Sequence, residues 1–208
     1  MQKSLSPRKT PRQGRARATY DTLLQAAAHI ISRSGLAMFN TNAVAERAGV
    51  SIGTLYQYFP NKDALMVALI RRQQGRQQET LKAAIGAISS SSNLETIVRT
   101  LVRAAMQHHR DNDLLASAID HEEARLPVDD LLSGYLESSG AVVAPLLSRF
   151  VGEVRPIPPD QAARTLPALV RGVVDAWANL SPPQLDIAED EAVAAVLGYL
   201  RPSTRVGK

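Results

Sequence analysis

The sequence of 208 residues contains no cysteine. This absence excludes a disulfide framework, a thiolate zinc site and a cysteine nucleophile. The chain also has no apolar run near the roughly 18 residues that a membrane-spanning helix needs. Its first 17 residues lack the apolar stretch of a secretory signal. We therefore expect a cytoplasmic protein with no membrane partner.

Motifs for cofactors and metals are also missing. The sequence has no G-x-G-x-x-G and no P-loop. A His-Glu-x-x-His zinc motif fails because Arg125 stands where the second histidine would be. His108 and His109 are adjacent, so on a helix they point in different directions and make a poor chelate. We expect no cofactor, no metal site and no enzymatic activity.

Charge is unevenly distributed along the chain. The net charge is +4, but residues 1–60 hold eight Lys or Arg and two Asp or Glu, whereas the remainder holds sixteen and eighteen. A basic N-terminal part on a mildly acidic body predicts a polyanionic partner bound at one end. The basic residues that precede the first acidic one are Lys3, Arg8, Lys9, Arg12, Arg15 and Arg17. The alternative is that this segment is only a solvated, disordered tail.

Apolar residues recur with a helical period through nearly the whole chain, and no segment has the alternating, β-branched pattern of a strand. The sequence therefore predicts an all-α fold of about nine helices behind a disordered basic arm over residues 1–17. The first helix is expected to stop near Gly35, and the fourth to run from Asn61 to about Ile88. Later helices are expected over residues 93–110, 112–124, 127–151, 159–180 and 188–201.

The most informative stretch is residues 40–65, NTNAVAERAGVSIGTLYQYFPNKDAL. Asn40 or Thr41 can cap one short helix, and Ser51 can cap a second that Pro60 stops. Gly49 lies between the two helices, where a positive φ is costly for any residue with a side chain. Two short helices joined by a glycine-containing turn form a helix-turn-helix, whose second helix lies in the major groove of DNA.

The second of these helices carries hydroxyl groups and an amide but no charge. Thr54, Tyr56, Gln57 and Tyr58 lie on it, and Lys62 begins the next helix. Hydroxyls, lysines and helix N-termini hold phosphates, and a glutamine can make a bidentate contact with adenine. The alternative for either tyrosine alone is an ordinary half-buried aromatic residue.

The stretch AVAERAGVSIGTLYQYFPNKDAL resembles the DNA-binding domain of the TetR family of one-component bacterial repressors. The resemblance extends over roughly residues 18–66, and it implies an effector-binding and dimerisation domain over 67–208. By matching positions, the resemblance implies DNA contacts from Thr41, Asn42, Ser51, Ile52, Gly53, Thr54, Tyr56, Gln57, Tyr58 and Lys62. Ile52 and Asn42 depart from the usual family pattern. Isoleucine can offer a base only an apolar contact, such as one with a thymine methyl.

The basic arm gains a role if the chain binds DNA. An arm that precedes a helix-turn-helix can reach the minor groove, or it can act only through its charge. The basic residues expected to take part are Arg8, Lys9, Arg12, Arg15 and Arg17.

The family resemblance also implies that the last two long helices pair with their two-fold mates in a homodimer. Their broad apolar stripes fit such a four-helix bundle, although packing within one chain would use the same pattern. The expected interface residues are Leu166, Leu169, Val170, Val173, Trp177, Val193, Val196, Leu197 and Leu200.

An effector pocket is expected among the helices of the larger domain, because pockets combine apolar walls with a few polar groups. The proposed lining residues are Arg103, Met106, His109, Ile119, Tyr135 and Trp177. For each of them, plain core packing is the alternative. The resulting hypothesis is a homodimeric repressor that a small-molecule effector releases from its operator DNA. A helical interaction scaffold or an enzyme without a DNA-binding role is the alternative.

Overall fold

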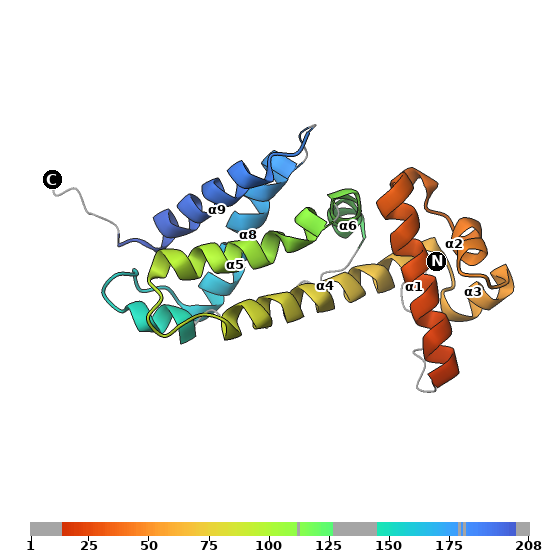
Figure 1. The fold of residues 1–208 in the computed structure, drawn as a ribbon, viewed down its shortest axis with the longest axis horizontal. Helices are drawn as coiled ribbons and strands as arrows, with labels where there is room; N and C mark the ends of the chain where they lie inside the picture. Colours follow the sequence, from red (N-terminus) through yellow and green to blue (C-terminus); the bar gives the residue numbers. More distant parts are fainter. Residues whose placement is uncertain (1–13, 112, 127–144, 179, 181, 203–208) are drawn as a thin grey trace. The chain divides into compact units, whose positions relative to one another are not determined.

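The computed structural model describes residues 14–111, 113–126, 145–178, 180 and 182–202 (Figure 1). This part of the chain is α-helical and contains no β-strand, which confirms the predicted all-α class. None of its helices is both long enough and apolar enough to cross a membrane. The α-helices are α1 (Gly14–Ser34), α2 (Thr41–Arg47), α3 (Ile52–Tyr58), α4 (Lys62–Gly86), α5 (Leu94–Asp111), α6 (Asp113–Arg125), α8 (Pro159–Ala178) and α9 (Leu185–Leu200), with short 3-10 helices η1 (Leu36–Met38) and η2 (Ser148–Phe150).

Several boundaries differ from the sequence prediction. Helix α1 begins at Gly14, so residues 14–17 are helical and are not part of a disordered arm. Alanine and arginine are strong helix formers, and they extend the first helix toward the N-terminus. Helix α9 begins at Leu185 and not at 188, with Asp186 in its first turn where the helix dipole favours an acid.

The helix predicted over residues 127–151 falls largely outside the described residues, which resume at residue 145. Its C-terminal end is a 3-10 turn, η2, and not an α-helix that continues to Val151. Gly152 follows with a φ of 96°, a conformation that ends any helix at this point.

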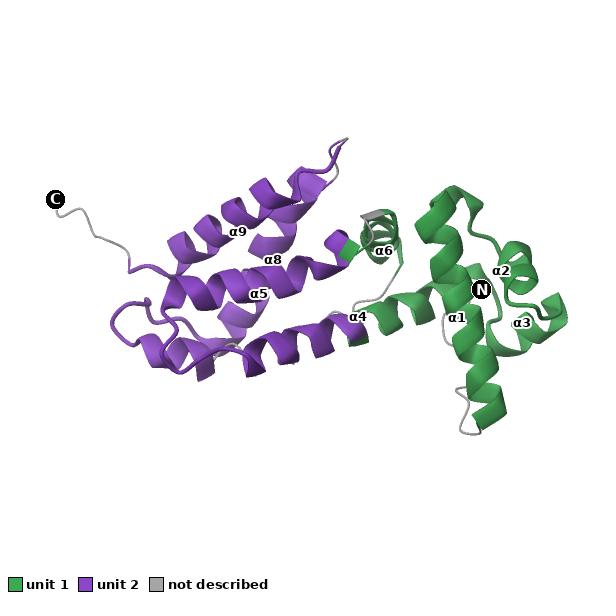
Figure 2. Ribbon diagram, viewed as in Figure 1, with its two compact units in different colours: residues 1–75, 111–128 green, residues 76–110, 129–208 purple. Residues whose placement is uncertain are grey.

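The chain divides into two compact units (Figure 2). Unit 1 comprises residues 1–75 and 111–128, and unit 2 comprises residues 76–110 and 129–208. The division therefore lies at Gly75 inside α4, beyond the domain boundary expected at residue 66. Helix α6 belongs to unit 1 although it follows α5 of unit 2 in the sequence.

The core of unit 1 is built around the first half of α4. Residues 64–70 of this helix are buried in succession, with exposures of 0–3%. A helix that is buried on every face must be surrounded by other elements. Helix α1 contacts α2 and α6, and α2 contacts α3, so these four helices enclose a common apolar centre. Its fully buried members include Leu23, Ile31, Val44, Leu55 and Phe59.

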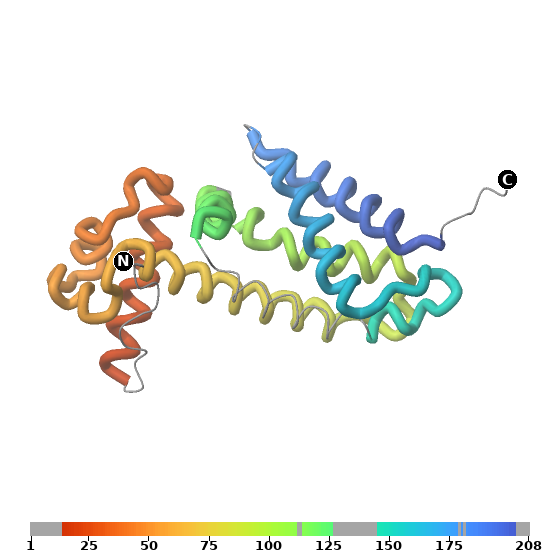
Figure 3. The backbone as a smooth tube through the Cα atoms, turned by 180° about the vertical axis from the view of Figure 1, so that it is seen from behind, coloured from red at the N-terminus to blue at the C-terminus, as the bar shows by residue number. Residues whose placement is uncertain are grey.

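The core of unit 2 is formed by α5, α8 and α9. Helices α8 and α9 lie side by side, as the two opposite views in Figures 1 and 3 show. Small residues, among them Ala162, Ala188 and Ala192, are buried in this core beside larger ones. Their size allows the two helices to approach closely, and Met106 of α5 is fully buried in the same cluster.

A buried carboxylate joins α5 to α9 in unit 2. Glu189 is only 5% exposed. Its Oε1 accepts hydrogen bonds from Arg103 Nε at 2.8 Å and Arg99 Nη1 at 3.4 Å. Its Oε2 accepts one from Arg110 Nη2 at 3.1 Å. Several guanidinium groups compensate the burial of one negative charge, which would be costly if it were unpaired.

Replacing Gly49 by alanine is expected to destabilise the chain by about 1–2 kcal/mol, because Gly49 has a φ of 67° that an alanine adopts only with strain. Gly75→Ala is the matched control, since Gly75 is helical and a Cβ there would meet open space. That substitution should stabilise by roughly 0.5–1 kcal/mol. Chemical denaturation of both variants measures the two effects, and the same sign for both would contradict the assigned turn.

Candidate nucleic-acid interface

Helices α2 and α3 form the predicted helix-turn-helix. Asn40 caps α2, and its Oδ1 accepts a hydrogen bond from the Ala43 backbone N–H at 2.9 Å. The turn between the helices contains Gly49 in the left-handed conformation, and the Val50 N–H donates to the Ala45 carbonyl at 3.0 Å. Val44 of α2 and Leu55 of α3 are both fully buried against the unit 1 core. Local capping and packing therefore fix the angle at which α3 leaves the turn.

The N-terminus of α3 is capped by Ser51. Its Oγ accepts a hydrogen bond from the Thr54 N–H at 3.0 Å and lies 2.9 Å from the Thr54 hydroxyl oxygen. Both hydroxyls are thus held in place before any ligand arrives. Ile52 and Gly53, which follow the cap, are exposed, as is Ser51 itself. The start of α3 therefore presents hydroxyl groups and one apolar side chain to solvent.

Residues 49–53 read G-V-S-I-G and so also fit the G-x-S-x-G pattern of a catalytic serine turn. That pattern produces a nucleophile only where a strand leads into the turn. Here the turn follows helix α2, and the Ser51 hydroxyl serves as a helix cap. The match therefore gives no support to a catalytic role.

The exposed face of α3 is tied to the start of α2. The Tyr56 hydroxyl lies 3.3 Å from the Thr41 hydroxyl, and the two share a hydrogen bond. Tyr56 is nevertheless 40% exposed. Gln57 on the same helix and Asn42 on α2 are exposed as well. These side chains can reach a ligand that lies across both helices.

Tyr58 is placed differently from the other predicted contact residues. It is half-buried, and its ring packs edge-on against Tyr20 of α1 with the ring centroids 6.3 Å apart. Tyr20 also lies 5.1 Å from the buried ring of Phe59. Burial raises the pKa of Tyr20 above its usual value of 10. The aromatic group Tyr20, Tyr58 and Phe59 therefore anchors the end of α3 on α1, a role for Tyr20 that no local sequence motif indicates.

Lys62 is the first residue of α4, and it is exposed. Its Nζ lies 5.2 Å from the centre of the Phe39 ring, a cation–π distance. Asn61 caps the helix through a 2.8 Å hydrogen bond from the Ala64 N–H. Figure 1 shows α2, α3 and the first turn of α4 at the same end of unit 1.

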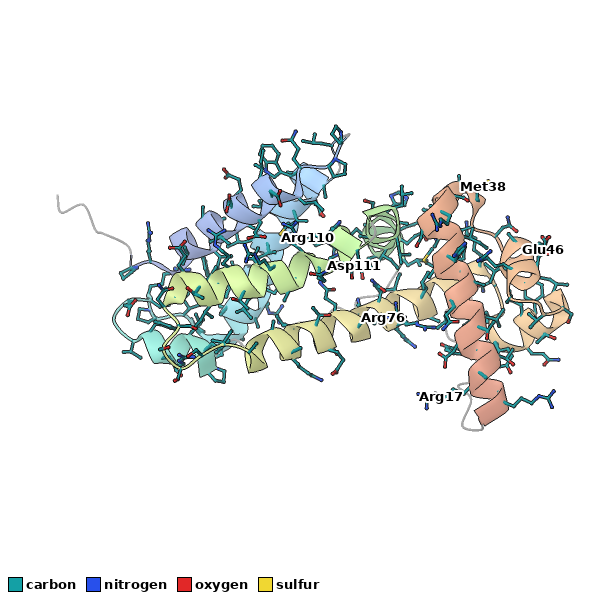
Figure 4. All side chains as sticks on the ribbon, viewed as in Figure 1. Arg17, Met38, Glu46, Arg76, Arg110 and Asp111 are labelled. Carbon is teal, nitrogen blue, oxygen red and sulfur yellow. The ribbon has the colours of Figure 1, made fainter. Side chains whose placement is uncertain are left out.

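Unit 1 also carries exposed positive charge. Arg15 and Arg17, predicted in the arm, are exposed near the start of α1, where Figure 4 labels Arg17. Arg8, Lys9 and Arg12 lie outside the described residues. Arg33 and Arg47 are exposed too. Loss of hydration, with the charges of Arg47 and Arg33, lowers the pKa of His29. These exposed arginines are local positive charges that can contact a polyanion.

The residues predicted to line an effector pocket are distributed over both units. Met106 is fully buried in the core of unit 2, and Trp177 packs partly buried against it. His109 is also buried, with its ring centre 4.2 Å from that of His108. Arg103 is engaged by Glu189. Ile119 is buried on α6 in unit 1, and Tyr135 lies outside the described residues.

The residues predicted at the dimer interface fall into two groups. Leu166, Val193, Val196 and Leu200 are buried in the core of unit 2 itself. Val170, Val173, Trp177 and Leu197 are partly buried and pack against that core, and Leu169 is also partly buried. Small residues, Gly172 and Ala176 on α8 and Ala194 and Gly198 on α9, are exposed next to the second group. The second group and these small residues form the surface that α8 and α9 can offer to another chain.

Two family models match most of the described chain. Residues 23–69 match the model described as "Bacterial regulatory proteins, tetR family". Residues 93–200 match the model described as "Tetracyclin repressor-like, C-terminal domain", which is more than half of the chain. The first match covers the helix-turn-helix with parts of α1 and α4, and the second covers α5 to α9.

Known proteins similar to this chain carry related names. The HTH-type transcriptional repressor KstR of Mycolicibacterium smegmatis is 29% identical over 181 residues, which are 85% of each chain. The fatty acid metabolism regulator protein of Bacillus subtilis is 27% identical over 131 residues, 58% of this chain and 63% of that protein. Among solved structures, the transcriptional regulator FadR from Bacillus subtilis in complex with stearoyl-CoA superposes with a TM-score of 0.69 at 19% identity. That match covers 88% of this chain and all of the other.

Proposed function

Because the chain belongs to the TetR family of bacterial regulatory proteins, we propose that it is a homodimeric repressor released from its operator DNA by a small-molecule effector. Family membership makes the chain a DNA-binding transcriptional regulator. It therefore favours this function over the helical scaffold or enzyme held as the alternative. The observation that carries the residue-level proposal is the exposed, polar α3, capped by Ser51 and joined to α2 through Tyr56 and Thr41. A protein that acts on the bacterial chromosome works in the cytoplasm.

In this proposal α3 enters the major groove, and its side chains divide by chemistry. Ser51, Thr54 and Tyr56 supply hydroxyls and Lys62 supplies an ammonium group, and such groups hold phosphates and set the register on the duplex. Thr41 and Asn42 extend this contact to the start of α2. Asn42 is exposed, and Thr41 shares a hydrogen bond with Tyr56 of α3. Both observations support this assignment.

Sequence reading falls to the exposed residues Gln57 and Ile52. A glutamine can make a bidentate contact with adenine, and an isoleucine can contact a thymine methyl. Gly53 has no side chain, so DNA can approach the α3 backbone closely at this position. Its outer side is open, because a Cβ there would contact only Ser51 Oγ of the protein. Tyr58 contributes mainly by anchoring α3 on Tyr20, so it positions the reading helix. The operator is therefore expected to contain A·T pairs at the positions that Gln57 and Ile52 face.

We assign unit 2 to dimerisation and effector binding. A dimer places two copies of α3 about 34–36 Å apart, in successive major grooves of a near-palindromic operator. The partly buried residues of α8 and α9, Leu169, Val170, Val173, Trp177 and Leu197, with the exposed small residues beside them, support a helix-pairing surface. The buried residues Leu166, Val193, Val196 and Leu200 would then support this surface from the core.

The effector must bind the DNA-competent and the DNA-released states with different affinities, because equal affinity shifts no equilibrium. Two similar proteins direct the choice of compound. One is named a fatty acid metabolism regulator, and another was solved with stearoyl-CoA. We therefore propose an acyl-CoA thioester as the effector class, bound in unit 2 near Met106, His109 and Trp177.

The double variant Tyr56→Phe with Lys62→Ala is expected to bind the DNA upstream of its own gene no more tightly than a scrambled duplex. It loses a hydroxyl that joins the two helices and an ammonium that faces phosphate. Fluorescence anisotropy measures the affinity, and light scattering checks that the dimer is intact.

The matched control is Tyr199→Phe with Lys82→Ala, which makes the same chemical changes in unit 2. Among the described residues the Tyr199 hydroxyl has no hydrogen-bond partner, and Lys82 lies on the surface beside Glu79. This control should bind like the native protein. Native affinity in the Tyr56 and Lys62 variant would contradict the assigned DNA-binding residues.

Ala194→Arg is expected to convert the dimer to monomers, because it places a charge among the exposed small residues of α8 and α9. Ala83→Arg, which changes another exposed alanine, on α4, is the control and should stay dimeric. Sedimentation velocity separates the two species. A dimer that persists in Ala194→Arg with native secondary structure would place the interface elsewhere.

Stearoyl-CoA at saturating concentration is expected to weaken operator binding about 5- to 150-fold, the usual range of coupling between two sites. Free coenzyme A and stearate are the controls, and neither alone should reproduce the full effect. Unchanged anisotropy with acyl-CoA of every chain length would contradict the effector class while leaving DNA binding in place.

A further inference from the structure

Helix α6 is part of the unit that carries the helix-turn-helix. It contacts α1, and two polar links join it to α4. Gln74 Nε2 donates to Glu123 Oε1 at 3.1 Å, and Arg125 Nη2 donates to Asp63 Oδ1 at 2.7 Å. The second link reaches the first turn of α4, next to Lys62. A helix about sixty residues further along the chain therefore completes the support of the DNA-binding unit.

Arg125 binds two carboxylates at once. Besides Asp63, its guanidinium donates from both Nε and Nη2 to Glu122 Oε2, with the Nε bond at 3.0 Å. Glu122 is 5% exposed and the Asp63 side chain is 19% exposed, whereas the Arg125 side chain that joins them is 44% exposed. These hydrogen bonds, first to Glu122 and then to Asp63, raise the pKa of Arg125 above its already high usual value. Arg125 is thus a permanent cation fixed in a planar fork.

The first turn of α4 is held from several sides. Asn61 caps it, the Phe39 ring lies beneath the Lys62 ammonium, and Arg125 holds the Asp63 carboxylate. Because Lys62 and Asp63 are consecutive in one helical turn, a shift of that turn moves both side chains. The charges of Arg125, Asp63 and Glu122 together sum to a negative value, so this cluster is not itself attractive to phosphate.

We propose that Arg125 is a positioning residue for the DNA interface: by holding Asp63, it fixes the first turn of α4 so that Lys62 faces a DNA phosphate. The inference rests on the proposed function, since it requires that Lys62 contact DNA. It assigns α6 a part in DNA binding without any contact between α6 and the duplex. The positioning role and a simple effect of charge predict opposite changes in DNA affinity when the Asp63 carboxylate is removed. Loss of a negative charge beside the interface would by itself strengthen DNA binding, whereas loss of positioning weakens it.

The test uses the full-length variants Asp63→Asn, Arg125→Gln and the double variant, with Lys62→Ala as reference. Operator binding is measured by anisotropy across a series of salt concentrations. Asp63→Asn and Arg125→Gln are each expected to weaken binding about three- to tenfold, and the double variant should be no worse than either. The slope of log affinity against log salt should fall by up to about 0.9 in each, the value of one phosphate contact.

Lys62→Ala is also combined with Asp63→Asn. In the native background it should weaken binding and lower the salt slope, and in the Asp63→Asn background it should add little. Tighter binding by Asp63→Asn, or an undiminished effect of Lys62→Ala in that background, would overturn the positioning role. If Lys62→Ala in the native chain changes neither affinity nor slope, the proposed interface itself fails, and the inference fails with it.

Two controls separate positioning from general damage. Arg125→Gln leaves buried Glu122 without its partner and can unfold α6, whereas Asp63→Asn keeps the Arg125–Glu122 pair and carries the test alone in that case. Glu79→Gln breaks the exposed 2.8 Å pair with Lys82 in unit 2, and it should leave affinity and salt slope unchanged. A loss of affinity in Glu79→Gln equal to that of Asp63→Asn would contradict the inference.

Discussion

The burial of α4 from Ala64 to Ile70 is the constraint on which the DNA-binding unit depends. A helix with no solvent-facing side over two turns needs neighbours on every side. Polar contacts join α4 to α1 through Arg72 and Asp21, and to α6 through Arg125 and Asp63. Because α3 packs through Leu55 and Phe59 into this centre, its opposite face is left to solvent. The polar reading surface is therefore a geometric result of the same packing that stabilises the unit.

The two units use charge in different ways. In unit 2 the arginines of α5 form ion pairs with carboxylates of α9. Arg99, Arg103 and Arg110 all pair with Glu189. In unit 1 the ion pairs among the described residues are formed by Arg72 and Arg125. They do not include the exposed residues Arg15, Arg17, Arg33 and Arg47. Uncompensated exposed arginines create the positive potential that attracts DNA, whereas compensated ones hold helices together. The arginines of the basic N-terminal part of the sequence thus become exposed positive charges on α1 and α2.

Much of the helix-turn-helix could be predicted from the sequence because its determinants are local. Asn40 and Ser51 cap the helices that follow them, Gly49 takes the positive φ of the turn, and Pro60 follows the end of α3. Such signals act over three or four residues, and the structure confirms the helices they predict. The start of α1 differs from the prediction because the charge of Arg15 and Arg17 indicates a solvated arm, whereas arginine also favours a helix.

Contacts between distant residues could not be predicted in the same way. The pairs Arg125–Asp63 and Arg103–Glu189 are separated by 62 and 86 residues, and no local pattern encodes them. The spacing of Glu122 and Arg125 on one helix is compatible with an ion pair, but it does not show that Glu122 is buried in unit 1. The effector pocket and the dimer contacts also depend on packing between helices. For them the sequence indicates which residue types take part, but it does not show which residues contact one another.

The most direct measurement is a fluorescence-anisotropy titration of the native protein against the DNA upstream of its own gene, at two salt concentrations and beside a scrambled duplex. Saturable binding at least about a thousandfold tighter than to the scrambled duplex is the expected result for a specific regulator. Weak, equal and strongly salt-dependent binding to both duplexes would leave only the electrostatic attraction of unit 1. That result would contradict the claim that α3 reads this sequence.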